Sequence, residues 1–274
     1  MSPIPLPAER IAPETWLVTE LFPGMPGAHV PVRSAVITGS EPVIVDTGTG
    51  LNRHAWTEAV FSLVDPADVR WIFLSHDDHD HTGNLMEVLA ACPAATLVGN
   101  WFEVERLQGD LPLPRHRMRW VNTGESFVAG DRELVALRPP IWDSPSTRGL
   151  FDTRSGVYLA GDAFASMVVE GVTDAADLED SLWEETFTEM NRQLSPWHQY
   201  LDTAKYGRLL DRLEGIGATT VVGAHGAVLR ETRIAQAYDI LRRLPDMPEV
   251  EWFGQDHLEM VLAAEQELKV AKAG

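Results

Sequence analysis

The stretch that decides the fold is Leu74-Ser75-His76-Asp77-Asp78-His79-Asp80-His81-Thr82-Gly83-Asn84. It follows an apolar run that is typical of a strand and precedes the helical pattern of Leu85, Val88 and Leu89. All six residues of 76–81 are histidine or aspartate, and such a run would be costly to bury without partners. Because α/β sheets place ligands where a strand opens into a helix, we interpret the stretch as a metal-binding loop and not as a solvated surface loop.

The composition limits the class of protein. The chain has 274 residues, 45% of them hydrophobic, which is enough to bury the core of one large α/β domain. Its formal net charge of −19 repels nucleic acid and anionic membrane surfaces alike, so we expect neither as a partner. The single cysteine, Cys92, excludes an intramolecular disulfide and a multi-cysteine metal site. With no leader-like start and no membrane-length apolar run, we expect a cytoplasmic protein.

The pattern along the chain predicts a single domain. No repeat, low-complexity tract or shift of composition divides it, so we expect one domain over residues 1–274 with a helical insertion around 174–213. Short β-branched and apolar runs, such as 43–45 and 157–160, predict strands. They alternate with amphipathic helical patterns, as in the segment after Leu229, and this alternation predicts a layered α/β fold.

The metal-binding loop resembles the signature of the metallo-β-lactamase superfamily, which reads His-x-His-x-Asp-His at the end of a strand. In the one register that fits, His76 is the first histidine and Asp78 stands in place of the second. Asp80 and His81 then close the motif. His79 falls on an x position, so the resemblance implies that it faces substrate or supports the ligands. The implied fold is a four-layer αββα sandwich with two mixed β-sheets.

Three further segments match the superfamily in the expected order. Residues 43–48 resemble an early strand that ends in an aspartate supporting the metal loop, and residues 158–162 resemble the strand that delivers a bridging aspartate. Residues 221–226 resemble the strand that carries the last histidine. Each segment alone would be weak evidence, because a lone aspartate often forms a turn and a lone histidine is often a satisfied polar group. Together they imply Asp162 and His225 as ligands.

One ligand position departs from the superfamily pattern. The superfamily has a histidine about eight residues before an apolar-aromatic pair, and counting back from Leu150-Phe151 places Asp143 there. Two interpretations stay open. Either Asp143 is a ligand, or it only caps the turn at Ser144-Pro145 and the site lacks one ligand.

The implied ligand set combines three histidines with four carboxylates. One implied half-site consists of His76, Asp78 and Asp143, and the other consists of Asp80, His81 and His225. Asp162 would bridge the two. Zinc hydrolases of the superfamily use more histidines and fewer carboxylates. Because hard anionic oxygen donors suit iron or manganese and zinc sites rely on imidazole and thiolate, we expect two metal ions, with iron favoured over manganese and zinc.

A carboxylate in place of the second histidine also resembles the flavodiiron proteins and the related oxygen-binding diiron proteins, whose motif reads His-x-Glu-x-Asp-His. This resemblance implies a non-haem diiron protein that binds or activates O2 or NO as an oxidoreductase. Flavodiiron proteins carry a flavodoxin domain that these 274 residues do not contain, so we expect a separate electron-donor protein. Trp142 would limit solvent access to the irons, and ordinary core packing explains it equally well.

The alternative is a metal-dependent hydrolase, in which a metal-bridging hydroxide attacks an ester, a lactone or a phosphoester. Arg148 or His198 would then hold an anionic small-molecule substrate. A sensor that only binds its ligand is a third interpretation. Aromatic residues in the stretch 174–200, which we expect to be exposed, would form a homodimer contact.

Overall fold

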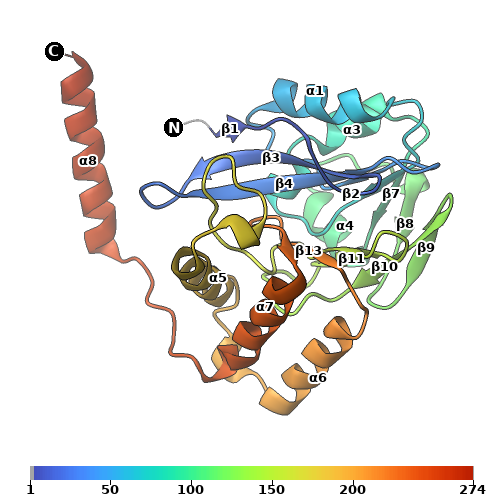
Figure 1. The fold of residues 1–274 in the computed structure, drawn as a ribbon. Coiled ribbons are helices and arrows are strands. Elements are labelled where there is room, and N and C mark those ends of the chain that lie inside the picture. Colours follow the sequence, from blue (N-terminus) through green and yellow to red (C-terminus); the bar gives the residue numbers. More distant parts are fainter. Residues whose placement is uncertain (1–2, 274) are drawn as a thin grey trace.

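Two β-sheets lie face to face at the centre of the computed structural model, which describes residues 3–273 and their side chains except those of 265 and 267–273. Helices cover the outer face of each sheet, so the layers follow the order α, β, β, α (Figure 1). The predicted four-layer sandwich is therefore confirmed. The predicted domain range of 1–274 includes residues 1, 2 and 274, which lie outside the described residues.

The first sheet has eight strands in the order β1-β3-β4-β5-β6-β7-β8, with β2 paired to β3. Its strands are β1 (Ile4–Pro5), β2 (Glu9–Ala12), β3 (Thr15–Pro23), β4 (His29–Ile37), β5 (Val43–Val45), β6 (Trp71–Phe73), β7 (Thr96–Gly99) and β8 (Met118–Trp120). Pairing is antiparallel from β1 to β5 and parallel from β5 to β8. The short apolar strands β5 and β6 are buried on both faces, as parallel strands usually are.

The second sheet has six strands in the order β14-β13-β12-β11-β10-β9. Its strands are β9 (Ser126–Ala129), β10 (Arg132–Leu137), β11 (Gly149–Asp152), β12 (Val157–Leu159), β13 (Thr220–Val222) and β14 (Leu229–Arg230). Only the β12–β13 pair is parallel, so both described sheets are mixed, as predicted. Leu134 and Leu159 of this sheet pack with Val45 and Phe73 of the first in the core between the sheets.

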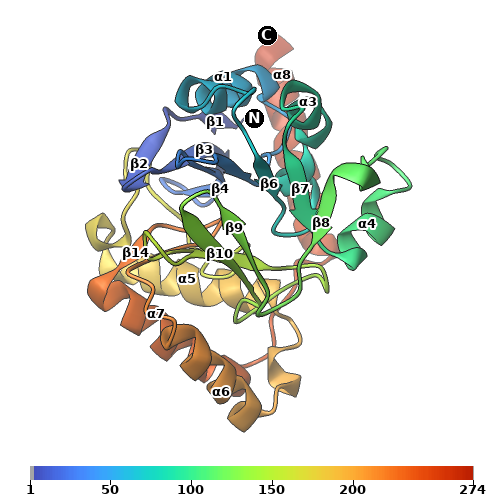
Figure 2. The same ribbon diagram turned by 90° about the vertical axis from the view of Figure 1, so that its right-hand side faces the viewer.

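Helices enclose the two sheets. Those on the side of the first sheet are α1 (Arg53–Leu63), α2 (His79–Thr82), α3 (Leu85–Ala91) and α4 (Trp101–Leu107); those on the side of the second are α5 (Asp180–Leu194), α6 (Thr203–Glu214) and α7 (Glu231–Arg243). Figure 2 shows α1 and α3 on one side and α5, α6 and α7 on the opposite side. Short 3-10 helices are η1 (Arg115–Arg117), η2 (Ala175–Asp177), η3 (His198–Tyr200) and η4 (Leu244–Asp246).

The segment predicted as a helical insertion, around 174–213, holds η2, α5, η3 and α6 in the structure. Its aromatic side chains are not uniformly exposed, which corrects that expectation. Trp183 is buried and packs on Phe187 with ring centroids 5.1 Å apart, because α5 turns its apolar face toward α7 and the second sheet. Of Trp183, Phe187 and Tyr200, only Tyr200 is largely exposed.

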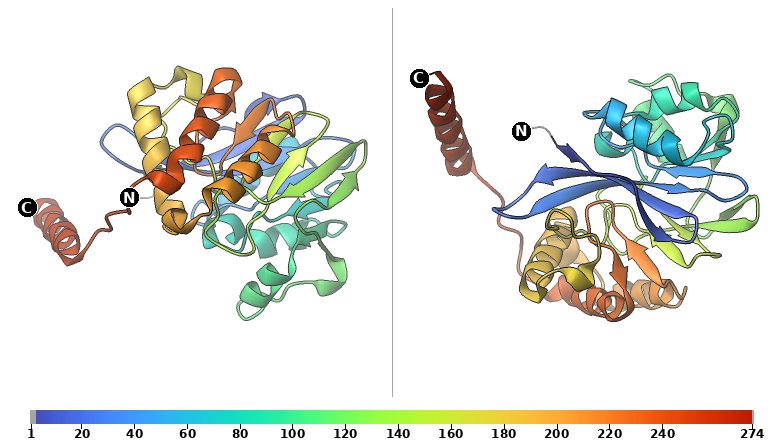
Figure 3. Two further views of the ribbon diagram at one scale, coloured as in Figure 1. Left: turned by 90° about the horizontal axis from the view of Figure 1, so that it is seen from below. Right: turned by 45° about the horizontal axis from the view of Figure 1, so that its top comes forward.

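The C-terminal helix α8 (Gln255–Ala273) stands apart from the four layers (Figures 1 and 3). Residues 255–264 of this helix are exposed. Among the helices that the structure describes, none combines the length and the apolar character needed to cross a bilayer.

The sheets bring the ends of four strands to one place. Since β5 is parallel to β6 and β12 is parallel to β13, the loops after each pair leave the same edge of their sheet. The loop after β5 packs directly on the loop after β6. Gly83 donates its N–H to the carbonyl oxygen of Gly48 at 2.9 Å, and a Cβ on Gly83 would lie 2.2 Å from the carbonyl carbon of Thr49.

We expect Gly83→Ala to destabilise the protein by about 1–3 kcal/mol, because the added methyl group collides with backbone that cannot rotate away. Gly109→Ala is the matched control: no heavy atom lies within 4 Å of its added Cβ, and it should change the free energy of unfolding by less than about 0.5 kcal/mol. Denaturant unfolding of both variants measures the difference. Equal stability of the two variants would contradict the close packing of the two loops.

Candidate metal centre

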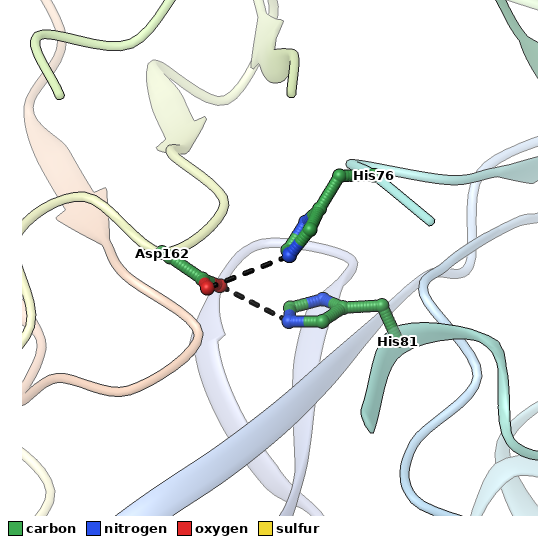
Figure 4. Close-up of side chains that lie close together, drawn as sticks. All are labelled: His76, His81 and Asp162. Atoms are coloured by element: carbon green, nitrogen blue, oxygen red, sulfur yellow. Dashed lines mark ion pairs between the residues drawn. The ribbon is translucent and has the colours of Figure 1, made fainter. Parts of the chain in front are cut away.

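Asp162, just after β12, lies at the centre of a histidine cluster. Its Oδ2 is 3.4 Å from Nε2 of His76, and its Oδ1 is 3.0 Å from Nε2 of His81 (Figure 4). The same Oδ1 is 3.3 Å from Nε2 of His225. One carboxylate thus contacts imidazoles from the loop after β6 and from the loop after β13.

The seven predicted ligands gather in three overlapping groups, in each of which the ligand atoms lie within 4.8 Å of one another. The groups are His76, His81 and Asp162; Asp80, His81 and His225; and His76, Asp78 and Asp143. The last two correspond to the two predicted half-sites. The first group joins them through Asp162, as a bridging ligand would.

The buried atoms at the centre lack hydrogen-bond partners. Nε2 of His76, Nε2 of His81 and Oδ1 of Asp162 are all buried, and none is hydrogen-bonded within the described part of the chain. Their ion-pair contacts with one another do not replace well-formed hydrogen bonds, whose absence is costly for buried groups, and cations placed among them would satisfy all three atoms at once. The donor set is one that holds metal ions, so the residues present fit a two-metal site.

An acceptor fixes the far side of the His81 ring and of the His225 ring, which leaves Nε2 of each for a metal. Nδ1 of His81 lies 2.9 Å from Oδ2 of Asp46, whose Oδ1 accepts the N–H of Ser75 at 2.7 Å. Nδ1 of His225 lies 3.0 Å from the carbonyl oxygen of Pro31. The sequence pattern indicated the supporting aspartate after β5. It gave no signal for Pro31, because any residue offers a carbonyl.

The loop that carries Asp143 is anchored on Asp77, a role that sequence reasoning missed. The Asp77 side chain is buried and its Oδ1 accepts the hydroxyl of Ser144 at 3.0 Å and that of Ser146. Arg106 of α4 pairs with the other oxygen. The sequence signal for this contact was weak. It consisted of a carboxylate on an x position of the motif and of two serines, far from it in the sequence, on either side of Pro145. Asp77 therefore ties the loop of Asp143 to the metal-binding loop itself.

The contacts of Asp143 bear on the two open interpretations. Its Oδ2 is 4.0 Å from Nε2 of His76, and its Oδ1 accepts the hydroxyl of Thr147 at 3.3 Å. The turn is closed by other groups: the N–H of Ser146 donates to Oγ of Ser144, and the N–H of Thr147 donates to the carbonyl of Ser144. The carboxylate thus faces the cluster, while Ser144 serves the turn.

Arg148 and Arg138 hold the same loop by its carbonyls. Nη1 of Arg148 donates to Ser146 and Thr147, at 3.2 and 2.8 Å, and Nη1 of Arg138 donates to Thr147 at 2.9 Å. Burial lowers the pKa of Arg148. The substrate-binding role of Arg148 stays a prediction. In the structure its guanidinium also holds the loop of Asp143 by its carbonyl oxygens.

The other predicted catalytic residues lie at the margin of the cluster. His79 is exposed and belongs to none of the three groups. Trp142 is half-buried and packs on Trp197 with ring centroids 4.7 Å apart, while Arg138 lies 5.3 Å from the Trp142 ring. His198 is buried outside the three groups, and its ring nitrogens have no hydrogen-bond partner within the described residues. Their catalytic roles stay predictions.

The cluster holds protons where a metal would bind. Burial and His81 oppose protonation of His76, but Asp162 and Asp78 outweigh them and raise its pKa to about 10. Burial opposes protonation of His81 and His225 as well, and Asp162 again outweighs it and raises the pKa of each well above the usual range. Burial favours protonation of Asp162, yet the three imidazoles hold its pKa well below the usual range.

Comparison with known proteins points to one family. Residues 33–226, which include all seven candidate ligands, match a family model described as ODP family beta lactamase. The chain is 24% identical over 211 residues to the anaerobic nitric oxide reductase flavorubredoxin of Salmonella typhi, a match that covers 75% of this chain and 43% of the relative.

Solved structures agree in fold. The flavodiiron protein from Giardia intestinalis superposes with a TM-score of 0.77 at 16% identity, covering 88% of this chain and 59% of that one. The rubredoxin oxygen:oxidoreductase from Desulfovibrio gigas gives a TM-score of 0.75 at 16% identity, covering 87% and 61%. The chain spans less than half the length of the curated relatives that it matches.

We expect metal binding to release protons and to strengthen as the pH rises from 6 to 8. The metal-free imidazoles are protonated in this range, since the pKa of His76 is about 10, and a metal must displace those protons. Calorimetric titration with Fe²⁺ under anaerobic conditions, in two buffers of different ionisation enthalpy, counts the released protons. Affinity that is independent of pH, with no proton release, would contradict this charge arrangement.

If Asp143 is a ligand, Asp143→Asn should weaken one of two metal sites by about 10–100-fold, because it removes an anionic donor at nearly constant shape. Asp143→His should instead keep two ions and shift the iron-to-zinc ratio toward zinc. Elemental analysis of both variants and of the parent protein measures the two effects. Unchanged metal content and iron-to-zinc ratio in both variants would remove Asp143 from the ligand set.

Proposed function

The chain belongs to the ODP beta-lactamase family, and on this premise we propose that it is a non-haem diiron protein that binds or activates O2 or NO as an oxidoreductase. Structural neighbours of the chain include a flavodiiron protein and a rubredoxin oxygen:oxidoreductase, and its relatives include a nitric oxide reductase flavorubredoxin. The names of two of them refer to nitric oxide reduction and to an oxygen oxidoreductase. These names support the proposed pair of diatomic ligands, although the sequences are distant.

The observation that carries the proposal is the excess of carboxylates. Four aspartates and three histidines supply the three ligand groups. Burial raises the pKa of Asp143, and the negative charges of Asp162 and Asp78 add to the shift. Hard, higher-charged cations offset this charge better than a zinc pair does, and imidazole-rich sites suit zinc. Iron is therefore the proposed metal, ahead of manganese.

The protein's residues have separate tasks in this proposal. His76, Asp78 and Asp143 would hold one ion, Asp80, His81 and His225 would hold the other, and Asp162 would bridge them. A diiron centre would supply redox equivalents and an open position for a diatomic molecule. The indoles of Trp142 and Trp197, which pack on each other in a tilted arrangement, would limit the access of water. Asp77 would keep that loop in register with the metal-binding loop.

The electrons would come from a separate donor protein. The word rubredoxin forms part of the names of the flavorubredoxin relative and of the rubredoxin oxygen:oxidoreductase. The proposed electron donor is therefore a small one-electron carrier protein. A homodimer and a cytoplasmic location also stay proposals, the latter on the single cysteine of the chain.

The test starts from protein expressed in iron-supplemented medium and purified without chelators. We expect about two metal ions per chain with iron in excess of zinc, and a near-ultraviolet absorption band in air that disappears on anaerobic reduction with dithionite. Addition of O2 or NO to the reduced protein should restore or alter the spectrum, and an electrode should record consumption of the gas. Asp162→Asn, which keeps the shape of the bridging side chain, should lose the band.

Zinc with a colourless sample would contradict the proposal, and hydrolysis of an ester, lactone or phosphoester by that sample would establish the hydrolase alternative. If the protein contains iron but its absorption spectrum changes with neither O2 nor NO, the proposal that it binds one of these gases would also be contradicted. Protein reconstituted with Zn²⁺ alone serves as the control, because it should have the same fold and no redox response.

A further inference from the structure

A cavity separate from the metal centre is lined in part by residues of β2, β3 and β4. Its volume is about 500 Å³, within the range of small-ligand sites, and its lining includes none of the seven candidate metal ligands. Backbone bridges between His29 and Val168 and between Asp174 and Val228 join the segments around it. Much of its wall is apolar: Leu6, Ile11, Leu21, Val168, Val172 and Val228.

Arg33 of β4 lines this cavity without a partner. Only 5% of the residue's surface is exposed, and Nε and Nη1 are buried with no hydrogen bond to the part of the chain that the structure describes. No carboxylate of the described residues lies within ion-pair distance of the guanidinium. Thr19 stands directly opposite on β3 and lines the same cavity, so both polar side chains are on one face of the sheet.

An anion would stabilise the positive charge of Arg33. Burial lowers the pKa of Arg33 to about 10, although Glu9 opposes the shift, so the guanidinium remains charged at neutral pH. A buried cation with unsatisfied donors is costly, and proteins ordinarily pair it. A ligand anion in the adjoining cavity would complete the pairing.

The other charged groups of the wall restrict the anion. Arg230 is already bound, by Oδ2 of Asp174 at 2.9 Å and by the carbonyl of Ile11 at 2.6 Å. Carboxylates of Glu9, Asp174 and Asp177 line the cavity as well, and they would repel a dianion such as phosphate. Arg10 also lines the cavity, but it is exposed and donates to the carbonyl of Ala12, so Arg33 is the one buried cation without a partner among the described lining residues. A single negative charge suits this arrangement, and the apolar wall suits a hydrocarbon body.

We propose that this cavity binds a small aliphatic monocarboxylate, with its carboxylate on Arg33 and Thr19 and its chain against Leu21, Val168 and Val228. Arg33 also lines a small interlayer cavity bounded by Asp46 and Ser75, the residues behind His81. The ligand would therefore lie close to the support of the metal centre. The proposal does not rest on which metals the centre holds.

Calorimetric titration of the metal-loaded protein with octanoate tests this site. The parent protein should bind one octanoate, and Arg33→Met, which keeps an unbranched apolar stem and removes the charged guanidinium, should weaken binding by about 10–100-fold. Arg10→Met is the matched control, because Arg10 lines the same cavity but donates its Nε to the carbonyl of Ala12. It should bind octanoate within about threefold of the parent, as surface charges contribute little.

Two further probes keep the proposal falsifiable if Arg33→Met is poorly folded, which its melting temperature and metal content would reveal. On the parent protein, octanol should bind at least about tenfold more weakly than octanoate, since it lacks the charge, and inorganic phosphate should not compete. Absence of octanoate binding at millimolar concentration would overturn the proposal. Equal binding of octanol, competition by phosphate, or undiminished binding to a folded Arg33→Met variant would do so as well.

Discussion

Mutual repulsion among carboxylates is the constraint on which this structure depends. Asp78, Asp80, Asp143 and Asp162 converge from three loops onto three imidazoles, and such a cluster is stable only when cations separate its members. Without metal ions, protons on the histidines would supply this positive charge, because the carboxylates raise the pKa values of His76, His81 and His225. Metal ions in place of those protons would satisfy the unpaired buried atoms and join the two sheets through Asp162.

The surroundings of the cluster are arranged to hold it in place. Asp46 adopts a positive φ of 58° after β5, a conformation that few residues other than glycine, asparagine and aspartate adopt readily, and in this position it orients both Ser75 and His81. Asp77 points away from the ions and binds the loop of Asp143. Neighbouring residues of one loop, His76 and Asp77, thus serve the ligand cluster and the scaffold respectively, so a one-residue shift would disrupt both contacts.

The layered α/β fold could be predicted from local patterns, and most of the cluster from the resemblance of four short segments to the metallo-β-lactamase superfamily. The run of histidine and aspartate after an apolar strand marks the metal-binding loop, and the strands ending at Asp162 and His225 are short apolar runs before polar residues. The missed features depend on tertiary contacts. The serines that bind Asp77 are almost 70 residues from it, Pro31 contributes only a carbonyl, and the burial of Trp183 follows from how α5 packs on α7. Arg33 reads as an ordinary strand arginine until the cavity beside it is known.

The central claim is that Asp162 bridges two iron ions. Anomalous diffraction from crystals of the iron-supplemented protein, collected on both sides of the iron absorption edge and of the zinc edge, tests it most directly. The account predicts two peaks that appear at the iron edge, one on each side of the Asp162 carboxylate, with His76 and Asp143 at one and His81 and His225 at the other. A single peak, or two peaks that appear only at the zinc edge, would contradict it.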